Sequence, residues 1–169
     1  MTNKIIAFTR NDILVRTAIY YLTFICLGLG AGATGPTIPA LAEQTGSTLA
    51  MISGNFLAGS IGYSLGTLLG GRLFDRLRGH PLLGMAQTLS GALVFTFPFI
   101  PHFWMLALVV ACKGLADGIM NTGINTLLVW THREKAAPYM NGLHFAFGLG
   151  AFLAPLLAAQ VLGIEGGYR

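Results

Sequence analysis

Apolar residues along this chain form five long runs, separated by short stretches that hold most of the charged residues. The runs cover residues 16–41, 48–73, 82–100, 104–130 and 137–162. Each is close to the roughly 20 residues that a helix needs to cross the hydrocarbon core of a bilayer. The pattern therefore predicts an all-α membrane protein with five transmembrane helices.

The run 104–130 departs from this apolar pattern because it carries a polar residue at every fourth position. These residues are Lys113, Asp117, Asn121 and Asn125, and their spacing keeps them on one slowly turning face of a helix. Charged side chains are costly inside a bilayer, and those that occur there usually face a bundle interior or a watery cavity. The stripe therefore predicts a functional site within the membrane.

The composition favours the same class of protein. Hydrophobic residues make up 54% of the chain and charged residues 9%, whereas a soluble domain usually has about 25% charged residues. The net charge of +4 comes from single basic residues between the apolar runs, which argues against a nucleic-acid partner and for a lipid bilayer. Cys26 and Cys112 both lie in apolar runs and indicate no disulfide framework.

The basic residues also predict the orientation of the chain in the membrane. Eight of them lie at or before the start of the first run, at or after the end of the second, or after the fourth: Lys4, Arg10, Arg16, Arg72, Arg76, Arg78, Arg133 and Lys135. Lys and Arg concentrate in cytoplasmic loops. We therefore expect a multi-pass protein of the cell membrane with a cytoplasmic N-terminus. The first run has no cleavage-type ending, so we expect no removable signal peptide.

The chain also resembles itself at an offset of 86 residues, which aligns the first two runs with the last two without a gap. Between residues 26 and 71, eleven of 46 positions are identical. The identical pairs include Cys26 with Cys112, Gly28 with Gly114, Asn55 with Asn141, and Gly62 with Gly148. Chance similarity between glycine-rich helices is the alternative explanation.

A repeat of three spans reverses its orientation in the membrane, as in the inverted repeats of secondary transporters. A sixth span is then expected after Arg169. We therefore expect residues 1–169 to be a fragment of a 12-helix transporter. They would cover the N-terminal half, with its inverted 3+3 repeat, and stop before the sixth helix of that half.

A short motif after the second run points to a known family. Gly71, Leu73, Asp75 and Arg76 resemble the signature between the second and third helices of the major facilitator superfamily, although Arg78 stands where that signature has glycine. The resemblance implies that Gly71, Asp75, Arg76 and Arg78 form a conformational latch between two six-helix halves. The alternative is an ordinary positively charged cytoplasmic loop.

A narrower resemblance lies in the fourth and fifth runs. The stretches Gly118–Asn125 and Asn141–Gly150 are similar to the sugar-permease branch, which contains the L-fucose permease and the sodium-dependent glucose transporter type. The resemblance implies that Asn121, Asn125, Asn141 and His144 contact a sugar, whose hydroxyls suit amide and imidazole groups. Each of these side chains could instead join helices by hydrogen bonds.

The same resemblance argues against proton coupling by the fucose-permease mechanism, because the acids of that protein correspond to Gly35 and Asn121 here. Lys113 and Asp117 are left as the candidate coupling groups. They could simply neutralise each other, or Asp117 could bind Na⁺ or a proton while Lys113 releases it. We expect no cofactor beyond such an ion. His80, His102 and His132 are expected at the membrane interface.

These features together predict a secondary active transporter that moves a small polar solute, most simply a sugar, by alternating access. A drug or small-molecule exporter of the same superfamily is the second interpretation. A membrane scaffold that does not transport is the third. An enzyme is not expected, because the sequence shows no nucleophile–base set, metal-ligand cluster or phosphate-binding loop.

Overall fold

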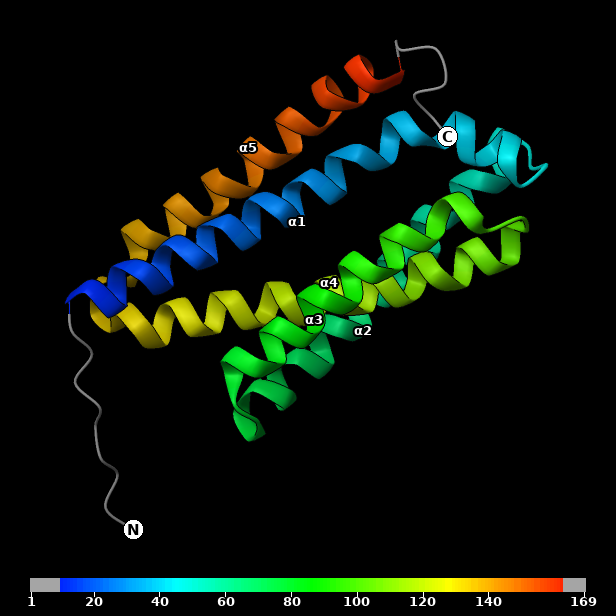
Figure 1. The fold of residues 1–169 in the computed structure, drawn as a ribbon. Helices are drawn as coiled ribbons and strands as arrows, with labels where there is room; N and C mark the ends of the chain where they lie inside the picture. The colour runs from blue at the N-terminus through cyan, green and yellow to red at the C-terminus, as the bar shows by residue number, and fades with distance from the viewer. Residues whose placement is uncertain (1–9, 163–169) are drawn as a thin grey trace.

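The computed structural model describes residues 10–162 of the chain, and their secondary structure is helical (Figure 1). The α-helices are α1 Arg10–Gln44, α2 Leu49–Arg76, α3 Gly79–Thr96, α4 Phe103–His132 and α5 Ala136–Leu162. Two short 3-10 helices, η1 Phe97–Phe99 and η2 Arg133–Lys135, lie in the connections. The predicted all-α class is therefore confirmed.

Three stretches of the described residues are long and apolar enough to cross a membrane. They are Asn11–Gln44, Gly79–Phe99 and Phe103–Val161, and the last of these contains both α4 and α5. Helix α2 is not among them, and its sequence includes six glycines and three serines, which lower its hydropathy. The count of five transmembrane helices thus stays a prediction.

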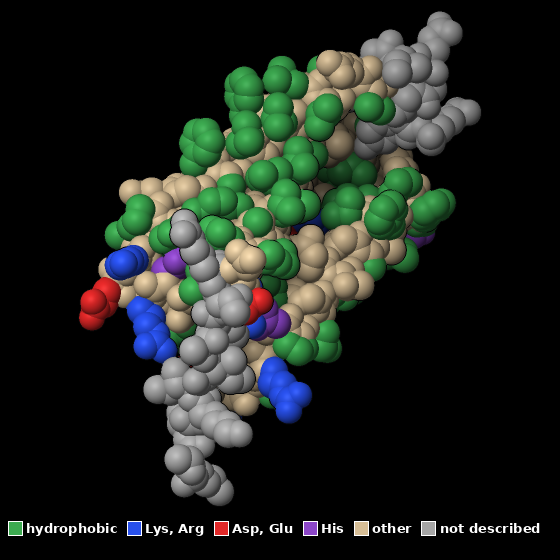
Figure 2. All heavy atoms as spheres, turned by 60° about the vertical axis from the view of Figure 1, so that its left-hand side comes forward, with side chains coloured by type: hydrophobic (Ala, Val, Ile, Leu, Met, Phe, Trp, Pro, Cys, Tyr) green, Lys and Arg blue, Asp and Glu red, His purple; other side chains and the backbone are tan. Residues whose placement is uncertain are grey.

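The outer surface of the bundle is rich in large apolar side chains. Leu68, Phe95, Phe99, Trp104 and Phe145 are each at least 71% exposed, and soluble proteins rarely expose apolar surface on this scale. Figure 2 shows hydrophobic side chains over most of the body, with most charged side chains in view gathered at one end. This distribution supports a multi-pass membrane protein.

Two pairs of parallel helices form the framework, α1 with α5 and α2 with α4, and α3 packs against α4 (Figure 1). Glycines lie where the paired backbones meet. A Cβ on Gly28 of α1 would overlap the carbonyl oxygen of Phe147 in α5, and one on Gly66 of α2 would overlap that of Leu115 in α4. Small residues at such contacts let helices approach closely in lipid.

The two pairs make corresponding contacts. Gly62 of α2 meets Ala111 of α4, just as Gly150 of α5 meets Ile25 of α1. Ala111 and Ile25 are 86 residues apart, as in the sequence repeat, but Gly62 and Gly150 are 88 residues apart. A Cβ on Gly148, which the gapless alignment pairs with Gly62, would have no neighbour within 4 Å. The alignment therefore needs a shift of two residues between α2 and α5.

Two apolar clusters hold the helices together at opposite ends. The larger cluster joins α1, the end of α2, α3, α4 and α5 through residues such as Tyr20, Phe74 and Leu128. The smaller one includes Leu41, Ile52 and Leu106 near the opposite end.

Candidate functional site

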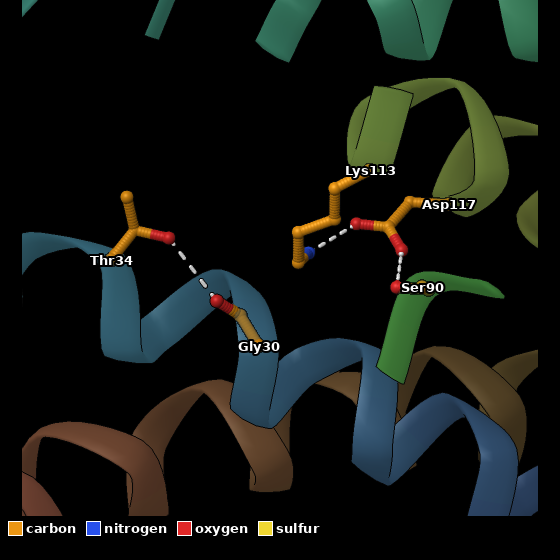
Figure 3. Close-up of polar contacts among 5 residues, drawn as sticks. All are labelled: Gly30, Thr34, Ser90, Lys113 and Asp117. Atoms are coloured by element: carbon orange, nitrogen blue, oxygen red, sulfur yellow. Dashed lines mark hydrogen bonds and ion pairs between the residues drawn. The ribbon is translucent and has the colours of Figure 1, made fainter. Parts of the chain in front are cut away.

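A buried ion pair lies in the middle of α4. The Lys113 ammonium donates to the Asp117 carboxylate, with 2.5 Å between Nζ and Oδ2, and their side chains are 15% and 12% exposed. The pair forms because residues four apart on a helix lie one above the other. The other carboxylate oxygen, Oδ1, accepts a hydrogen bond from Ser90 Oγ of α3 at 2.5 Å (Figure 3).

Ser90 is not among the site residues predicted from the sequence. It is buried, 7% exposed, and it ties α3 to the charged pair on α4. Gln87 precedes it by about one turn of α3, and its Oε1 atom is buried without a hydrogen-bond partner among the described residues. Gln87 and Ser90 are three residues apart and so share one face of α3, but Thr88 lies between them and their spacing does not show which face meets α4.

Two cavities meet at the ion pair, and both are lined by Gly30, Lys113 and Asp117. The larger, of about 490 Å³, lies between α1, α2 and α4. Its polar lining also includes Thr34, Thr37, Asn55, Ser60, Tyr63 and Ser64. The smaller, of about 240 Å³, lies between α1, α3 and α4 and is also lined by Gln87 and Ser90.

Glycine at position 30 leaves space beside the ammonium. A Cβ built there would lie 3.5 Å from Lys113 Nζ, in ordinary contact, so a larger side chain would compete with Lys113 for room. Figure 3 shows Lys113 reaching from α4 toward α1, where Thr34 Oγ1 donates to the Gly30 carbonyl oxygen at 3.1 Å. The ammonium thus has open space toward α1.

Asn55 of α2 is a second polar residue that the predicted site omitted. Its side chain is buried, 8% exposed, and it lines the larger cavity. Its Oδ1 atom has no hydrogen-bond partner among the described residues. A buried amide oxygen without a donor is costly, so Asn55 is a candidate contact for a polar solute. In the sequence it was notable only as a position of the internal repeat.

The four residues predicted to contact sugar lie elsewhere. Asn121 and Asn125 are partly buried on α4, where Asn125 Nδ2 donates to the Asn121 carbonyl oxygen at 2.7 Å. Asn141 and His144 are exposed on α5, and the His144 ring lies edge-on to Phe24, 6.1 Å between centroids. None of the four lines either of the two cavities. Their contact with a sugar stays a prediction.

The predicted latch residues surround the turn between α2 and α3. Arg76 is the last residue of α2, and Asp75, Arg76 and Arg78 are all exposed. A Cβ on Gly71 would meet open space, whereas one on Gly79 would lie 2.7 Å from Leu127 Cδ2. The glycine that follows Arg78 therefore allows α3 to begin close against α4. The latch role itself stays a prediction.

Two of the histidines expected at the interface lie inside helices and join them at the charged end. His80 is the second residue of α3, and its Nε2 is hydrogen-bonded to Tyr20 Oη of α1 at 3.0 Å. His132 ends α4, stacks on Tyr139 with 3.5 Å between ring centroids, and is hydrogen-bonded to Thr17 of α1 at 2.7 Å. These contacts hold α1 against both α3 and α4.

Residues 20–169 match the family model described as the Major Facilitator Superfamily, which confirms the resemblance seen in the sequence. The chain is 35% identical over 161 residues to sodium-dependent glucose transporter 1 of Rattus norvegicus. The aligned region covers 92% of this chain and 33% of that relative.

Two further relatives also match most of this chain but only part of their own length. The human protein of the same name is 36% identical over 141 residues, 83% of this chain and 27% of that protein. The major facilitator superfamily domain-containing protein 4A of Pongo abelii is 38% identical over 148 residues, 86% of this chain and 29% of that protein. The chain thus spans between 27% and 33% of the length of these relatives. No solved structure matches.

Proposed function

Because this chain belongs to the major facilitator superfamily, we propose that it acts in a secondary active transporter that carries a sugar by alternating access. One observation above all supports this proposal. A Lys–Asp ion pair lies inside the apolar bundle, where two cavities meet. Charged groups at such a depth are costly and commonly mark the path of a substrate or ion.

The larger cavity suits a small polar solute such as a sugar. Thr34, Ser60 and Tyr63, which carry hydroxyl groups, line it together with Asn55, whose buried amide oxygen has no hydrogen-bond partner among the described residues. These groups can donate to and accept from sugar hydroxyls, while Phe56 and Val110 supply apolar contact. The glucose transporters among the relatives support a sugar as the solute.

The helix pairs support an inverted repeat. Helices α1 and α5 form one parallel pair and α4 and α2 the other, with corresponding glycine contacts in each. Because successive spans alternate in direction, two matching pairs of opposite orientation are what a three-span inverted repeat produces. We propose that the five helices, with a sixth, form the N-terminal half of a 12-helix transporter and pack against a second half.

The coupling role falls to the ion pair in this proposal. Asp117 binds Na⁺ or a proton, and Lys113 leaves the carboxylate when the cation arrives. The charged end of the bundle, with Asp75, Arg76 and Arg78, faces the cytoplasm and carries the latch.

Uptake of a panel of labelled sugars into proteoliposomes by the full-length protein, under imposed Na⁺ or pH gradients, tests the proposal. Accumulation of one sugar under one of the gradients supports it. Extrusion of an unrelated organic molecule favours the exporter, and the absence of any transport favours a scaffold; either result contradicts a sugar importer.

The cavity is tested by Asn55→Leu, with Ser53→Ala on the exposed face of α2 as the control. We expect Asn55→Leu to raise the KM for the transported sugar about ten-fold, because it removes a hydrogen-bond acceptor from the site. Ser53 donates to the Leu49 carbonyl outside the cavity, so its replacement should leave KM unchanged. A loss of thermal stability without a change in KM would mean that Asn55 serves packing.

A further inference from the structure

The smaller cavity brings together oxygen atoms from two helices. Asp117 of α4 supplies its carboxylate, and Ser90 of α3 lies 2.5 Å from it through Oγ. Gln87 lines the same cavity, and its buried Oε1 has no hydrogen-bond partner among the described residues. The Ser90 hydroxyl donates a hydrogen bond to Asp117, and its Oγ atom still has lone pairs that can bind a cation. Three oxygen-bearing side chains therefore line this cavity, together with the ammonium-bearing side chain of Lys113.

From this geometry we propose that a sodium ion binds in the smaller cavity, with Asp117, Ser90 and Gln87 as its protein ligands. The inference rests on the proposed function, because it names the cation that drives transport at Asp117. Hard cations take carboxylate, hydroxyl and amide oxygens as ligands. A cavity of about 240 Å³ also has room for waters that complete the coordination shell.

Gln87 is the residue that favours sodium over a proton. A proton on Asp117 neutralises the carboxylate and supplies a single O–H donor, whereas a hard cation takes several oxygen ligands at once. A sodium ion between α3 and α4 would satisfy the Asp117 and Gln87 oxygens at once. The site is thus built for an ion with several oxygen ligands, and α3 enters the coupling mechanism, although it carries no charged residue.

The binding of sodium and the binding of the solute would then be coupled through Lys113. The ion competes with the ammonium for the carboxylate of Asp117, and Lys113 lines both cavities. Lys113 already borders the larger cavity beside Gly30, so the freed ammonium can turn into that cavity and donate to solute hydroxyls. Each ligand favours the same state of Lys113, so each strengthens the binding of the other.

Sodium binding to the purified full-length protein tests the site directly. Binding of radioactive ²²Na⁺ is titrated with unlabelled NaCl, and choline chloride keeps the ionic strength constant. We expect Gln87→Met and Ser90→Ala each to weaken sodium affinity by about 10- to 100-fold, as changes around a bound metal commonly do. Gln87→Glu keeps an oxygen at the site and should still bind sodium.

Thr88→Ala is the matched control on α3. Its hydroxyl donates to the Gly84 carbonyl oxygen at 2.9 Å and lies outside the cavity, so sodium affinity should not change. Thermal unfolding of every variant without sodium shows whether it is folded. Unchanged affinity in folded Gln87→Met and Ser90→Ala would overturn the proposal. A wild-type protein that binds no sodium but transports in response to pH would overturn it too.

Sugar counterflow without any ion gradient separates this site from the proposed function. Counterflow that persists in Gln87→Met while sodium binding is lost supports both the sugar-transport function and the sodium site. Sodium binding that follows the expected pattern without counterflow of any sugar would support the ion site and contradict the sugar transporter.

Discussion

Lys113 and Asp117 retain charge inside an apolar bundle because each neutralises the other and Ser90 adds a hydrogen bond. Their separation of four residues on α4 explains the contact, and Gly30 on α1 explains the space that the ammonium occupies. A charge pair of this kind is weak evidence for stability, since desolvation offsets much of the attraction. Its position between two cavities gives the better reason for its presence.

Replacing one partner of the Lys113–Asp117 pair should therefore destabilise the protein more than replacing both partners. We expect Lys113→Met to destabilise the protein by about 3 kcal/mol, because it leaves a buried carboxylate unpaired. The double variant K113M/D117L should lie within about 1 kcal/mol of the wild type, because neither charge remains to be desolvated. Denaturant unfolding in detergent measures both. Additive losses in the double variant would contradict this account of the pair.

At this scale the sequence predicts part of the site. The four-residue spacing of Lys113 and Asp117 predicts their shared face, and the structure places them in contact. Ser90, Gln87 and Asn55 could not be predicted with the same argument, because they are uncharged residues on other helices. Which of them face α4 depends on how α2 and α3 are rotated against it, and spacing within one helix carries no such information.

The helices themselves follow from the lengths of the apolar runs, and each of the five predicted spans overlaps one α-helix. Their pairing depends on glycine. Backbone approaches at Gly28 and Gly150 join α1 to α5, and those at Gly62 and Gly66 join α2 to α4. Such approaches require the absence of a Cβ, so these glycines fix the register of each pair.

Gly150 and Gly148 of α5 provide a matched comparison. We expect Gly150→Ala to destabilise the protein by about 1–3 kcal/mol, because the new Cβ would overlap the backbone of Ile25. Gly148→Ala should be tolerated, because a Cβ there meets nothing within 4 Å. Thermal unfolding in detergent compares the two variants. Equal destabilisation by the two variants, or a larger effect at Gly148, would favour the gapless alignment and contradict the two-residue shift between α2 and α5.

The two-residue shift shows where sequence alignment stops being informative. Identities such as Asn55 with Asn141 align without a gap, yet the contacts equate Gly62 with Gly150. The stretch from Ala111 to Gly150 is longer by two residues than that from Ile25 to Gly62. Glycine and leucine recur often enough in these helices to support either alignment, whereas backbone contacts support one.

For the whole molecule, charge is distributed along one axis. Charged side chains gather at the end where α1 begins and α2 meets α3 (Figures 1 and 2), and the apolar body lies beyond them. The positive-inside rule predicts that this end is cytoplasmic. The larger cavity extends away from it, between residues such as Leu41 and Ile52 of the opposite apolar cluster.

Accessibility of single cysteines checks the orientation. In a full-length variant whose native cysteines, Cys26 and Cys112 among them, are replaced, we expect Glu43→Cys to react with a membrane-impermeant maleimide added to intact cells. We expect Arg76→Cys to react only after the membrane is made permeable, because the positive-inside rule predicts that the basic end faces the cytoplasm. The reverse labelling pattern would contradict this orientation.

In the proposed mechanism, Asp117 couples a cation to the movement of a sugar. The most direct measurement compares Asp117→Asn with the wild type in proteoliposomes, using the sugar that the wild type accumulates. We expect Asp117→Asn to retain counterflow of the sugar but to lose accumulation driven by the cation gradient, because the amide no longer binds the cation. Accumulation by Asp117→Asn with unchanged dependence on the gradient would contradict the claim.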